Sequence, residues 1–148
     1  SNIRDWLYVE DHVRAIDLVL KQGRVGETYN VGGNEEHSNI DIVQEICAAI
    51  DTVLADRPEL QSRYAESPAC QGKSTDSLIT YVKDRPGHDW RYAIDATKLE
   101  GELGFQPAHT FATGLKDTIN WMLDNEGWWQ AVLDESYRDW MEQNYARR

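Results

Sequence analysis

The sequence predicts a mixed α/β (α+β) fold with a few short strands and about five helices. Two observations carry this prediction. Apolar residues recur at helical spacing in several segments, most of them next to residues that typically begin or end helices. Between these segments lie short runs rich in β-branched and aromatic residues, which indicate strands. With 148 residues, 41% of them hydrophobic, the chain is long enough to bury a core, and residues 1–148 are treated as one domain.

Strands are predicted at residues 5–9, 28–31 and 78–82. Each run combines aromatic or β-branched side chains, which favour the pleated backbone. The second run, Thr-Tyr-Asn-Val, ends at Gly32 and Gly33, a pair that typically closes a strand. The third run leads directly into a segment with a Pro-Gly turn.

Two long helices are predicted in the first half of the chain. The first begins near Val9, and its apolar stripe holds Val9, Val13, Ile16 and Leu20. Ser38, with Asp41 three residues later, is typical of the start of the second helix. The buried face of this second helix is expected to hold Ile42, Ile46, Ile50 and Val53.

Further helices follow in the second half. Asp95 is expected to cap a short helix that carries Leu99 and Leu103 and ends at Gly104. Thr110 begins another helix, whose inner face holds Phe111, Leu115, Ile119 and Met122. The last helix is predicted from about Trp128 to Asn144, and one of its sides holds Trp129, Leu133, Tyr137 and Trp140.

Residues 56–77 are predicted to form a long loop. The segment is polar and contains Pro58, Pro68 and Gly72, with a single helical turn expected around residues 59–64. Loops of this length in a compact domain are usually either mobile or functional, and we favour a mobile one.

Composition excludes several classes of function. The formal net charge of −11 argues against sequence-independent binding to nucleic acid, whose phosphates need a basic face. No apolar run approaches the roughly 20 residues that span a bilayer, and we expect neither a membrane segment nor a signal peptide. Cys47 and Cys70 are expected to be reduced thiols of a cytoplasmic protein. The four histidines show no zinc spacing, so no metal site is predicted.

Residues 84–89, Asp-Arg-Pro-Gly-His-Asp, form the strongest candidate for function. Proline fixes φ and glycine permits positive φ, so the predicted turn presents Arg85 and His88 on a rigid corner. An arginine at such a corner can bind phosphate oxygens through charge-assisted, often bidentate hydrogen bonds. A histidine such as His88, taken by itself, is more often a structural residue than a ligand-binding one.

Two residues elsewhere are further candidates. Arg4 directly precedes the first predicted strand and either joins Arg85 on a diphosphate or forms a surface ion pair with Asp5. Asn39 lies at the start of a predicted helix, where backbone N–H groups favour anions, and its alternative role is helix capping. The sequence contains no Ser-His-Asp pattern, phosphate-binding glycine loop or Tyr-x-x-x-Lys pair, so no catalytic residue is assigned.

Several motifs resemble those of a known family. Residues 4–12, Arg-Asp-Trp-Leu-Tyr-Val-Glu-Asp-His, and residues 26–35, Gly-Glu-Thr-Tyr-Asn-Val-Gly-Gly-Asn-Glu, are similar to segments of nucleotide-sugar enzymes in the extended short-chain dehydrogenase superfamily. The corner at 84–89, with Tyr-Ala-Ile-Asp at 92–95 and Glu-Leu-Gly-Phe-Gln-Pro at 102–107, resembles the dTDP-glucose 4,6-dehydratases. UDP-galactose 4-epimerases and GDP-mannose or CDP-glucose dehydratases share the Arg-Asp start and the Leu-Gly-aromatic-x-Pro pattern, but not the full corner.

The resemblance covers essentially the whole chain and implies a site that binds dTDP. Its members would be Arg4, Asn39, Asp84, Arg85, Pro86, Gly87, His88 and Tyr145. The arginines would bind the diphosphate, and Tyr145 would close over the ligand from the C-terminus. The sequence departs from the family pattern at Trp90, where a basic residue is usual, and in residues 56–77, a longer loop than expected.

The resemblance also implies what the chain lacks. In this family the NAD-binding Rossmann domain, the Tyr/Lys pair and the Asp-Glu acid/base precede the matched segments. The chain is therefore expected to be a C-terminal substrate-binding lobe, inactive alone. The whole enzyme would be an NAD-dependent lyase and a homodimer. By oxidation at C4, elimination across C5–C6 and return of the hydride to C6, it would convert dTDP-glucose into dTDP-4-keto-6-deoxyglucose and water, on the route to dTDP-rhamnose. A UDP- or CDP-sugar enzyme and a non-catalytic nucleotide-sugar-binding module are the alternatives.

Overall fold

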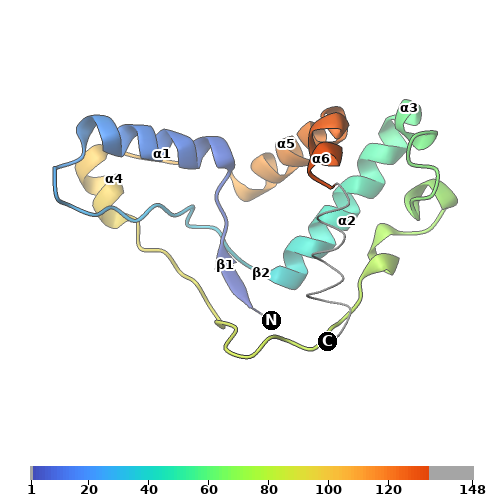
Figure 1. Cartoon of the computed structure of the whole chain (residues 1–148), viewed down its shortest axis with the longest axis horizontal. Helices are drawn as coiled ribbons and strands as arrows, with labels where there is room; N and C mark the ends of the chain where they lie inside the picture. The colour runs from blue at the N-terminus through green and yellow to red at the C-terminus, as the bar shows by residue number, and fades with distance from the viewer. Residues whose placement is uncertain (1, 134–148) are drawn as a thin grey trace.

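The computed structural model describes residues 2–133 and confirms the mixed α/β fold. The elements are β1 (Ile3–Asp5), α1 (Val9–Gln22), β2 (Glu36–Ser38), α2 (Asn39–Asp56), α3 (Pro58–Gln61), α4 (Thr97–Leu103), α5 (Phe111–Asp124) and α6 (Glu126–Val132). Two short 3-10 helices, η1 (Ala69–Gln71) and η2 (Thr75–Leu78), lie between α3 and α4. The helices form two groups, α1 with α4 and α2 with α3, α5 and α6, and β1 and β2 lie between the groups (Figure 1).

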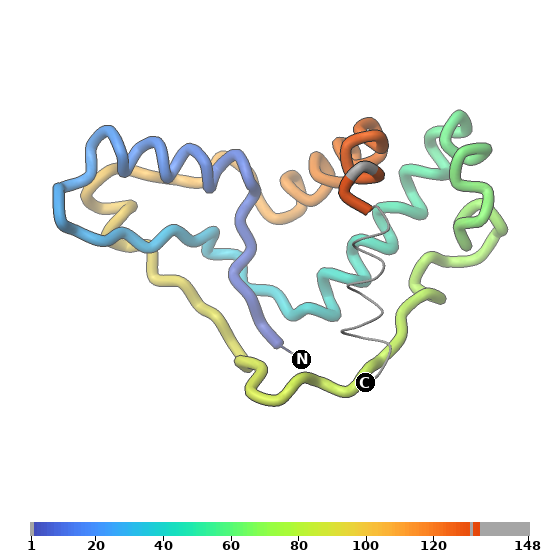
Figure 2. The backbone as a smooth tube through the Cα atoms, in the orientation of Figure 1, coloured from blue at the N-terminus to red at the C-terminus, as the bar shows by residue number. Residues whose placement is uncertain are grey.

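The sheet is small and antiparallel. In its register Ile3 lies opposite Ser38 and Asp5 lies opposite Glu36. A third segment runs along the other side of β1, where Ile3 N–H donates to the carbonyl oxygen of Trp90 at 2.9 Å and the N–H of Tyr92 donates to the carbonyl oxygen of Ile3 at 3.0 Å. Figure 2 shows this third segment as part of a long stretch that returns from the α2 group to α4. The first strand is therefore held on both edges.

The strand predictions were largely wrong. Of residues 5–9, only Asp5 belongs to β1, and Val9 already begins α1. Residues 28–31 form no strand, because no backbone hydrogen bond pairs them with another strand among residues 2–133; Tyr29 and Val31 pack on the core instead. Of residues 78–82, Leu78 ends η2 and the others have no regular structure. The second strand that does form, β2, was not predicted.

The helix predictions were mostly confirmed. The hydroxyls of Ser38 and Thr110 each accept a hydrogen bond from the N–H three residues later, and Gly104 ends α4 with a φ of +68°. Asp95 accepts from the N–H of the residue two positions on, although Ala96 is the N-cap by backbone geometry. The predicted last helix starts within α6, which begins earlier than expected, at Glu126, and ends at Val132 with Leu133 as its C-cap. Its predicted part from 134 to 144 lies outside the described residues.

Two small cores hold the helix groups together. Ala15, Leu99 and Phe105 are buried between α1 and α4, with Tyr29 and Val31 packed against them. In the other group the buried apolar residues lie mainly on α2 and α5, and they are Ile42, Cys47, Leu54, Leu60 and Ile119. Of the residues predicted on the buried face of α2, Ile42 is buried, whereas Ile46, Ile50 and Val53 are half-buried. Met122, predicted on the inner face of α5, is 40% exposed.

The apolar stripe of α1 does not pack as an amphipathic helix normally does. Val13 is 58% exposed and Leu20 is 80% exposed, and Val9 and Ile16 are exposed as well. The face that α1 turns toward α4 is instead centred on Ala15. Among the residues that the structure describes, nothing covers the stripe, which therefore forms an apolar surface.

The segment predicted as a loop at 56–77 contains more structure than the one expected helical turn. It holds α3, η1 and most of η2, which pack against α2. The carboxylate of Asp51 fixes its end by accepting from the N–H of Thr75 and the hydroxyl of Ser74, each at 3.0 Å. The hydrogen bond from the Thr75 hydroxyl is the main reason that the pKa of Asp51 is lowered. Whether the segment is mobile stays a prediction.

Two further expectations concern membrane-spanning helices and the state of the cysteines. None of their helices has both the length and the apolar character needed to cross a membrane. Cys47 is buried in α2, Cys70 lies in η1, and the two thiols are free.

Candidate functional site

The predicted corner at 84–89 is a turn in the structure. Pro86 and Gly87 form its tip, and Gly87 has a φ of +69°, a conformation that glycine adopts at no steric cost. Arg85 is exposed beside them, with its N–H on the carboxylate of Asp84 at 2.8 Å. The Arg85 side chain thus lies at the surface, where a ligand can reach it.

Arg4 and His88 meet although they are 84 residues apart in the sequence. The Arg4 guanidinium lies 2.9 Å from Nε2 of His88. Because arginine can only donate, Nε2 is the acceptor in this contact. On the other side of the ring, Nδ1 lies 2.7 Å from the carboxylate of Asp84. This hydrogen bond is the main reason that the pKa of Asp84 is lowered. The three side chains form a chain of charge-assisted contacts, which we call the Arg4–His88–Asp84 cluster.

The start of α2 is tied to this cluster through Asn2. The N–H of Asn39 donates to the carbonyl oxygen of Asn2 at 2.9 Å, and the side-chain amide of Asn2 lies 2.7 Å from Nδ1 of His88. Asn39 is exposed at the first position of α2, and Ser38 takes the capping role. The Asn39 side chain is therefore not needed as the N-cap.

The guanidinium of Arg4 has further partners. It donates to the carbonyl oxygen of Ile3 at 2.6 Å and to that of Asp89 at 3.1 Å, and its Cζ lies 4.5 Å from the centre of the Tyr92 ring. Arginine has five N–H donors, and three contacts occupy donors of Arg4 within the described residues. The rest of its donors are available to an anion.

The structure therefore brings together some of the predicted site residues. Arg4, Asp84 and His88 are in contact, and Asn39 joins them through Asn2. Arg85, Pro86 and Gly87 lie on the exposed tip of the corner, and Tyr145 lies outside the described residues. Sequence reasoning missed Asn2 and Tyr92 as members of this site, because their contacts with the cluster depend on the folded chain.

Arg4 does not form the alternative ion pair with Asp5 in the structure. The carboxylate of Asp5 accepts from the N–H of Gly33 at 3.0 Å and from that of Glu35 at 3.0 Å. A side chain on Gly33 would overlap the carbonyl oxygen of Trp6, and one on Gly32 would meet Asp5. The two glycines thus allow the chain to pack closely beside β1, and an internal carboxylate occupies the N–H of Gly33.

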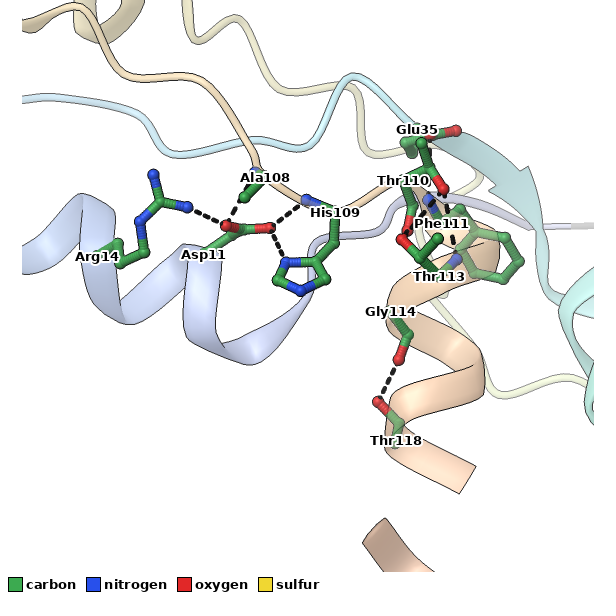
Figure 3. Close-up of polar contacts among 10 residues, drawn as sticks. All are labelled: Asp11, Arg14, Glu35, Ala108, His109, Thr110, Phe111, Thr113, Gly114 and Thr118. Atoms are coloured by element: carbon green, nitrogen blue, oxygen red, sulfur yellow. Dashed lines mark hydrogen bonds and ion pairs between the residues drawn. The ribbon is translucent and has the colours of Figure 1, made fainter. Parts of the chain in front are cut away.

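A second polar cluster joins α1 to the segment before α5 (Figure 3). Asp11 is fully buried, and its carboxylate accepts from the N–H groups of Ala108 and His109, each at 3.0 Å. Nδ1 of His109 lies 2.9 Å from the same carboxylate, and Arg14 forms an ion pair with it. With four donors around one buried carboxylate, this cluster is built to hold two segments together.

A cavity of about 350 Å³ lies beside this second cluster. Its walls come from α2, α5 and the segment between β1 and α1, and they are mostly apolar, including Trp6, Ile42 and Phe111. The indole N–H of Trp6 is buried and has no hydrogen-bond partner among the described residues. Apolar walls do not suit a diphosphate, so the Arg4–His88–Asp84 cluster is the better candidate for an anionic ligand.

Comparison with known proteins agrees with the motifs. Residues 1–118 match the family described as GDP-mannose 4,6 dehydratase. Because this match covers most of the chain, the chain belongs to that family.

Several relatives and solved structures that the chain resembles are dTDP-glucose 4,6-dehydratases. It is 55% identical over 138 residues to the one from Xanthomonas campestris, a match that covers 93% of this chain and 36% of the relative. A solved structure from Bacillus anthracis in complex with NAD has a TM-score of 0.68 at 41% identity, covering 88% of this chain and 34% of that one. Another from Streptomyces venezuelae, with NAD and TYD bound, has a TM-score of 0.69 at 35% identity, with the same coverage of 88% and 34%.

These matches confirm the resemblance found in the motifs. They also show its extent, since the chain spans only 36% of the length of the Xanthomonas relative and 35% of one from Neisseria meningitidis. The chain therefore corresponds to a part of such a dehydratase.

Proposed function

We propose that this chain is the nucleotide-binding part of a dTDP-glucose 4,6-dehydratase, a lyase that converts dTDP-glucose into dTDP-4-keto-6-deoxyglucose and water. The observation that carries the proposal is the Arg4–His88–Asp84 cluster, which joins two of the family-like motifs across the fold. The names of the relatives support this choice of substrate.

The proposed role of the cluster is to bind and orient the diphosphate of the ligand. Arg4 is held in place by neutral acceptors, so its positive charge remains available, and Arg85 lies exposed on the neighbouring corner. Two guanidinium groups near one diphosphate provide charge-assisted hydrogen bonds. Binding energy from this remote part of the ligand can position the sugar for reaction elsewhere in the enzyme.

NAD is proposed as the cofactor of the whole enzyme, as in the related solved structures, but Gly32 and Gly33 do not fit it. A pyrophosphate needs free backbone N–H groups at a glycine-rich turn. Here the N–H of Gly33 is already taken by Asp5, and the space around Gly33 is filled by Trp6. We therefore propose that NAD is held by a Rossmann domain outside this chain and that the chain is inactive alone.

The exposed apolar stripe of α1 supports the proposal of a partner domain, because such a domain would cover this surface. For the isolated chain we predict self-association through this surface. The double variant Val13→Glu, Leu20→Glu is expected to shift the chain to monomer, because two charges would have to be buried in the contact. Analytical ultracentrifugation over a range of concentrations measures the change.

The control for this prediction places two glutamates on another exposed helical surface. Gln44→Glu with Ala48→Glu adds the same side chains to α2 and is expected to leave the association unchanged. A wild-type chain that stays monomeric at every concentration, or equal association of both double variants, would contradict the role of the α1 stripe.

The proposal is tested by calorimetric titration of dTDP, UDP and CDP into the chain. We expect dTDP to bind most tightly, and Arg85→Ala to weaken it by about 10-fold, the loss of one charge-assisted contact. Tighter binding of UDP or CDP would indicate a dehydratase or epimerase for another nucleotide sugar. No binding of any nucleotide at millimolar concentration would reject the proposed role.

Other parts of the proposal concern the whole enzyme, which we expect to be a cytoplasmic homodimer on the route to dTDP-rhamnose. The net charge of −11 on this chain supports the expectation that the chain binds no nucleic acid. The alternative is a non-catalytic module that binds a nucleotide sugar. Formation of a 4-keto sugar by the chain alone would contradict the expectation that catalysis needs the partner domain.

A further inference from the structure

Tyr92 lies directly against the guanidinium of Arg4. The Arg4 Cζ is 4.5 Å from the centre of the Tyr92 ring, within the range of a cation–π contact. The guanidinium carbon lies over the Tyr92 ring, so this contact draws on the positive charge of Arg4. It comes in addition to the three hydrogen bonds of Arg4, which occupy three of its five donors.

Tyr92 is itself held on two sides. Its N–H donates to the carbonyl oxygen of Ile3 at 3.0 Å, which ties it to the strand that carries Arg4. Its hydroxyl donates to the carboxylate of Asp89, and this hydrogen bond is the main reason that the pKa of Tyr92 is raised. The hydroxyl therefore stays protonated and remains a donor at neutral pH.

The two contacts of Asp89 link the ring to the arginine. Its backbone carbonyl accepts from Arg4 at 3.1 Å, while its side chain accepts from Tyr92. The same residue thus fixes both partners of the cation–π pair. An arginine side chain loses much conformational freedom when it is ordered, so a scaffold that orders Arg4 before binding reduces that cost for a ligand.

We propose that Tyr92 is a positioning residue, which holds the guanidinium of Arg4 in place for the diphosphate of a nucleotide sugar. The inference rests on the proposed function, since it assumes that Arg4 binds the ligand. Tyr92 acts through Arg4, and its aromatic face is the part that does so. The hydroxyl adds only the link to Asp89.

The test compares two substitutions of Tyr92 by calorimetric titration of dTDP. Tyr92→Phe keeps the aromatic face and is expected to bind dTDP within about 2-fold of wild type. Tyr92→Leu keeps apolar bulk without the ring quadrupole and is expected to bind about 3- to 5-fold more weakly. In an Arg4→Met background, Tyr92→Leu is expected to cause no further loss, because the partner of the ring is gone.

A second measurement does not need the ligand. The Arg4 side-chain NMR signals of the free chain should carry a ring-current shift in wild type and in Tyr92→Phe, and lose it in Tyr92→Leu. Failure of wild type to bind dTDP would reject the proposed function and this inference with it. If wild type binds, equal affinities of the Phe and Leu variants, or a Leu effect that persists without Arg4, would overturn the role of Tyr92 alone.

Discussion

Replacing Asp11 with alanine is expected to lower the free energy of unfolding by about 3 kcal/mol. Asp11 is fully buried, and its carboxylate accepts from two backbone N–H groups and the imidazole of His109 (Figure 3). Alanine would leave these donors without their buried acceptor. Such a loss would loosen the contact between α1 and the segment before α5.

Chemical denaturation followed by circular dichroism measures this effect. The matched control is Asp17→Ala on the same helix, which removes an exposed carboxylate paired with Lys21 and should change stability by less than about 0.5 kcal/mol. Equal stabilities of the two variants would show that the buried cluster is not what joins these segments.

The cluster around Asp11 also makes the stability of the folded chain depend on pH in the acid range. Burial alone would raise the pKa of Asp11, but the N–H groups of Ala108 and His109 and the imidazole outweigh it, so the pKa is lowered from its ordinary value. A group with a lowered pKa contributes stability above its unfolded value, near 4, and this contribution is lost as the pH falls through the folded value. Denaturation of Asp11→Asn should accordingly depend less on pH below about 4 than that of wild type.

Replacing Arg4 with methionine is expected to weaken dTDP binding by about 30-fold, because a charge-assisted contact contributes about 2 kcal/mol. Methionine keeps the length of the side chain and removes its charge and donors. The substitution also frees Nε2 of His88, which Arg4 contacts at 2.9 Å. The dissociation constant is measured by calorimetry at fixed ionic strength, since salt screens such contacts.

Arg24→Met is the matched control for Arg4→Met. Arg24 pairs with Glu102 at the far end of α1, so its loss changes the net charge equally without touching the corner. Binding by this variant should stay within about 2-fold of wild type. Similar losses in both variants would show that dTDP responds to overall charge and not to the Arg4–His88–Asp84 cluster.

The helices could be predicted because their signals are local. Ser38, Thr110 and Gly104 mark helix ends within a few residues, and the structure has those ends. Strands depend on a partner, which a local pattern does not contain. Residues 28–31 have the composition of a strand but pair with no strand among the described residues. In contrast, β2 is a polar strand of three residues that pairs with β1, although its sequence has no strand pattern.

For α1 the sequence pattern defined an apolar face but not what that face contacts. Periodicity predicts that Val13 and Leu20 share a face, and they do lie on one side of the helix, but it does not say what covers that face. For the site, the resemblance pointed to Arg4, Asp84 and His88, which the structure brings together. The supporting contact of Tyr92 joins residues far apart in the sequence, and only the fold reveals it.

The central claim is that the Arg4–His88–Asp84 cluster and its corner form the nucleotide site, and an NMR titration of the chain with dTDP tests it most directly. We predict that amide signals of residues 2–4, 39 and 84–92 shift with increasing dTDP, while those around the buried carboxylate of Asp11 stay unchanged. Shifts concentrated at the apolar cavity beside Asp11, or no shifts at millimolar dTDP, would contradict the claim.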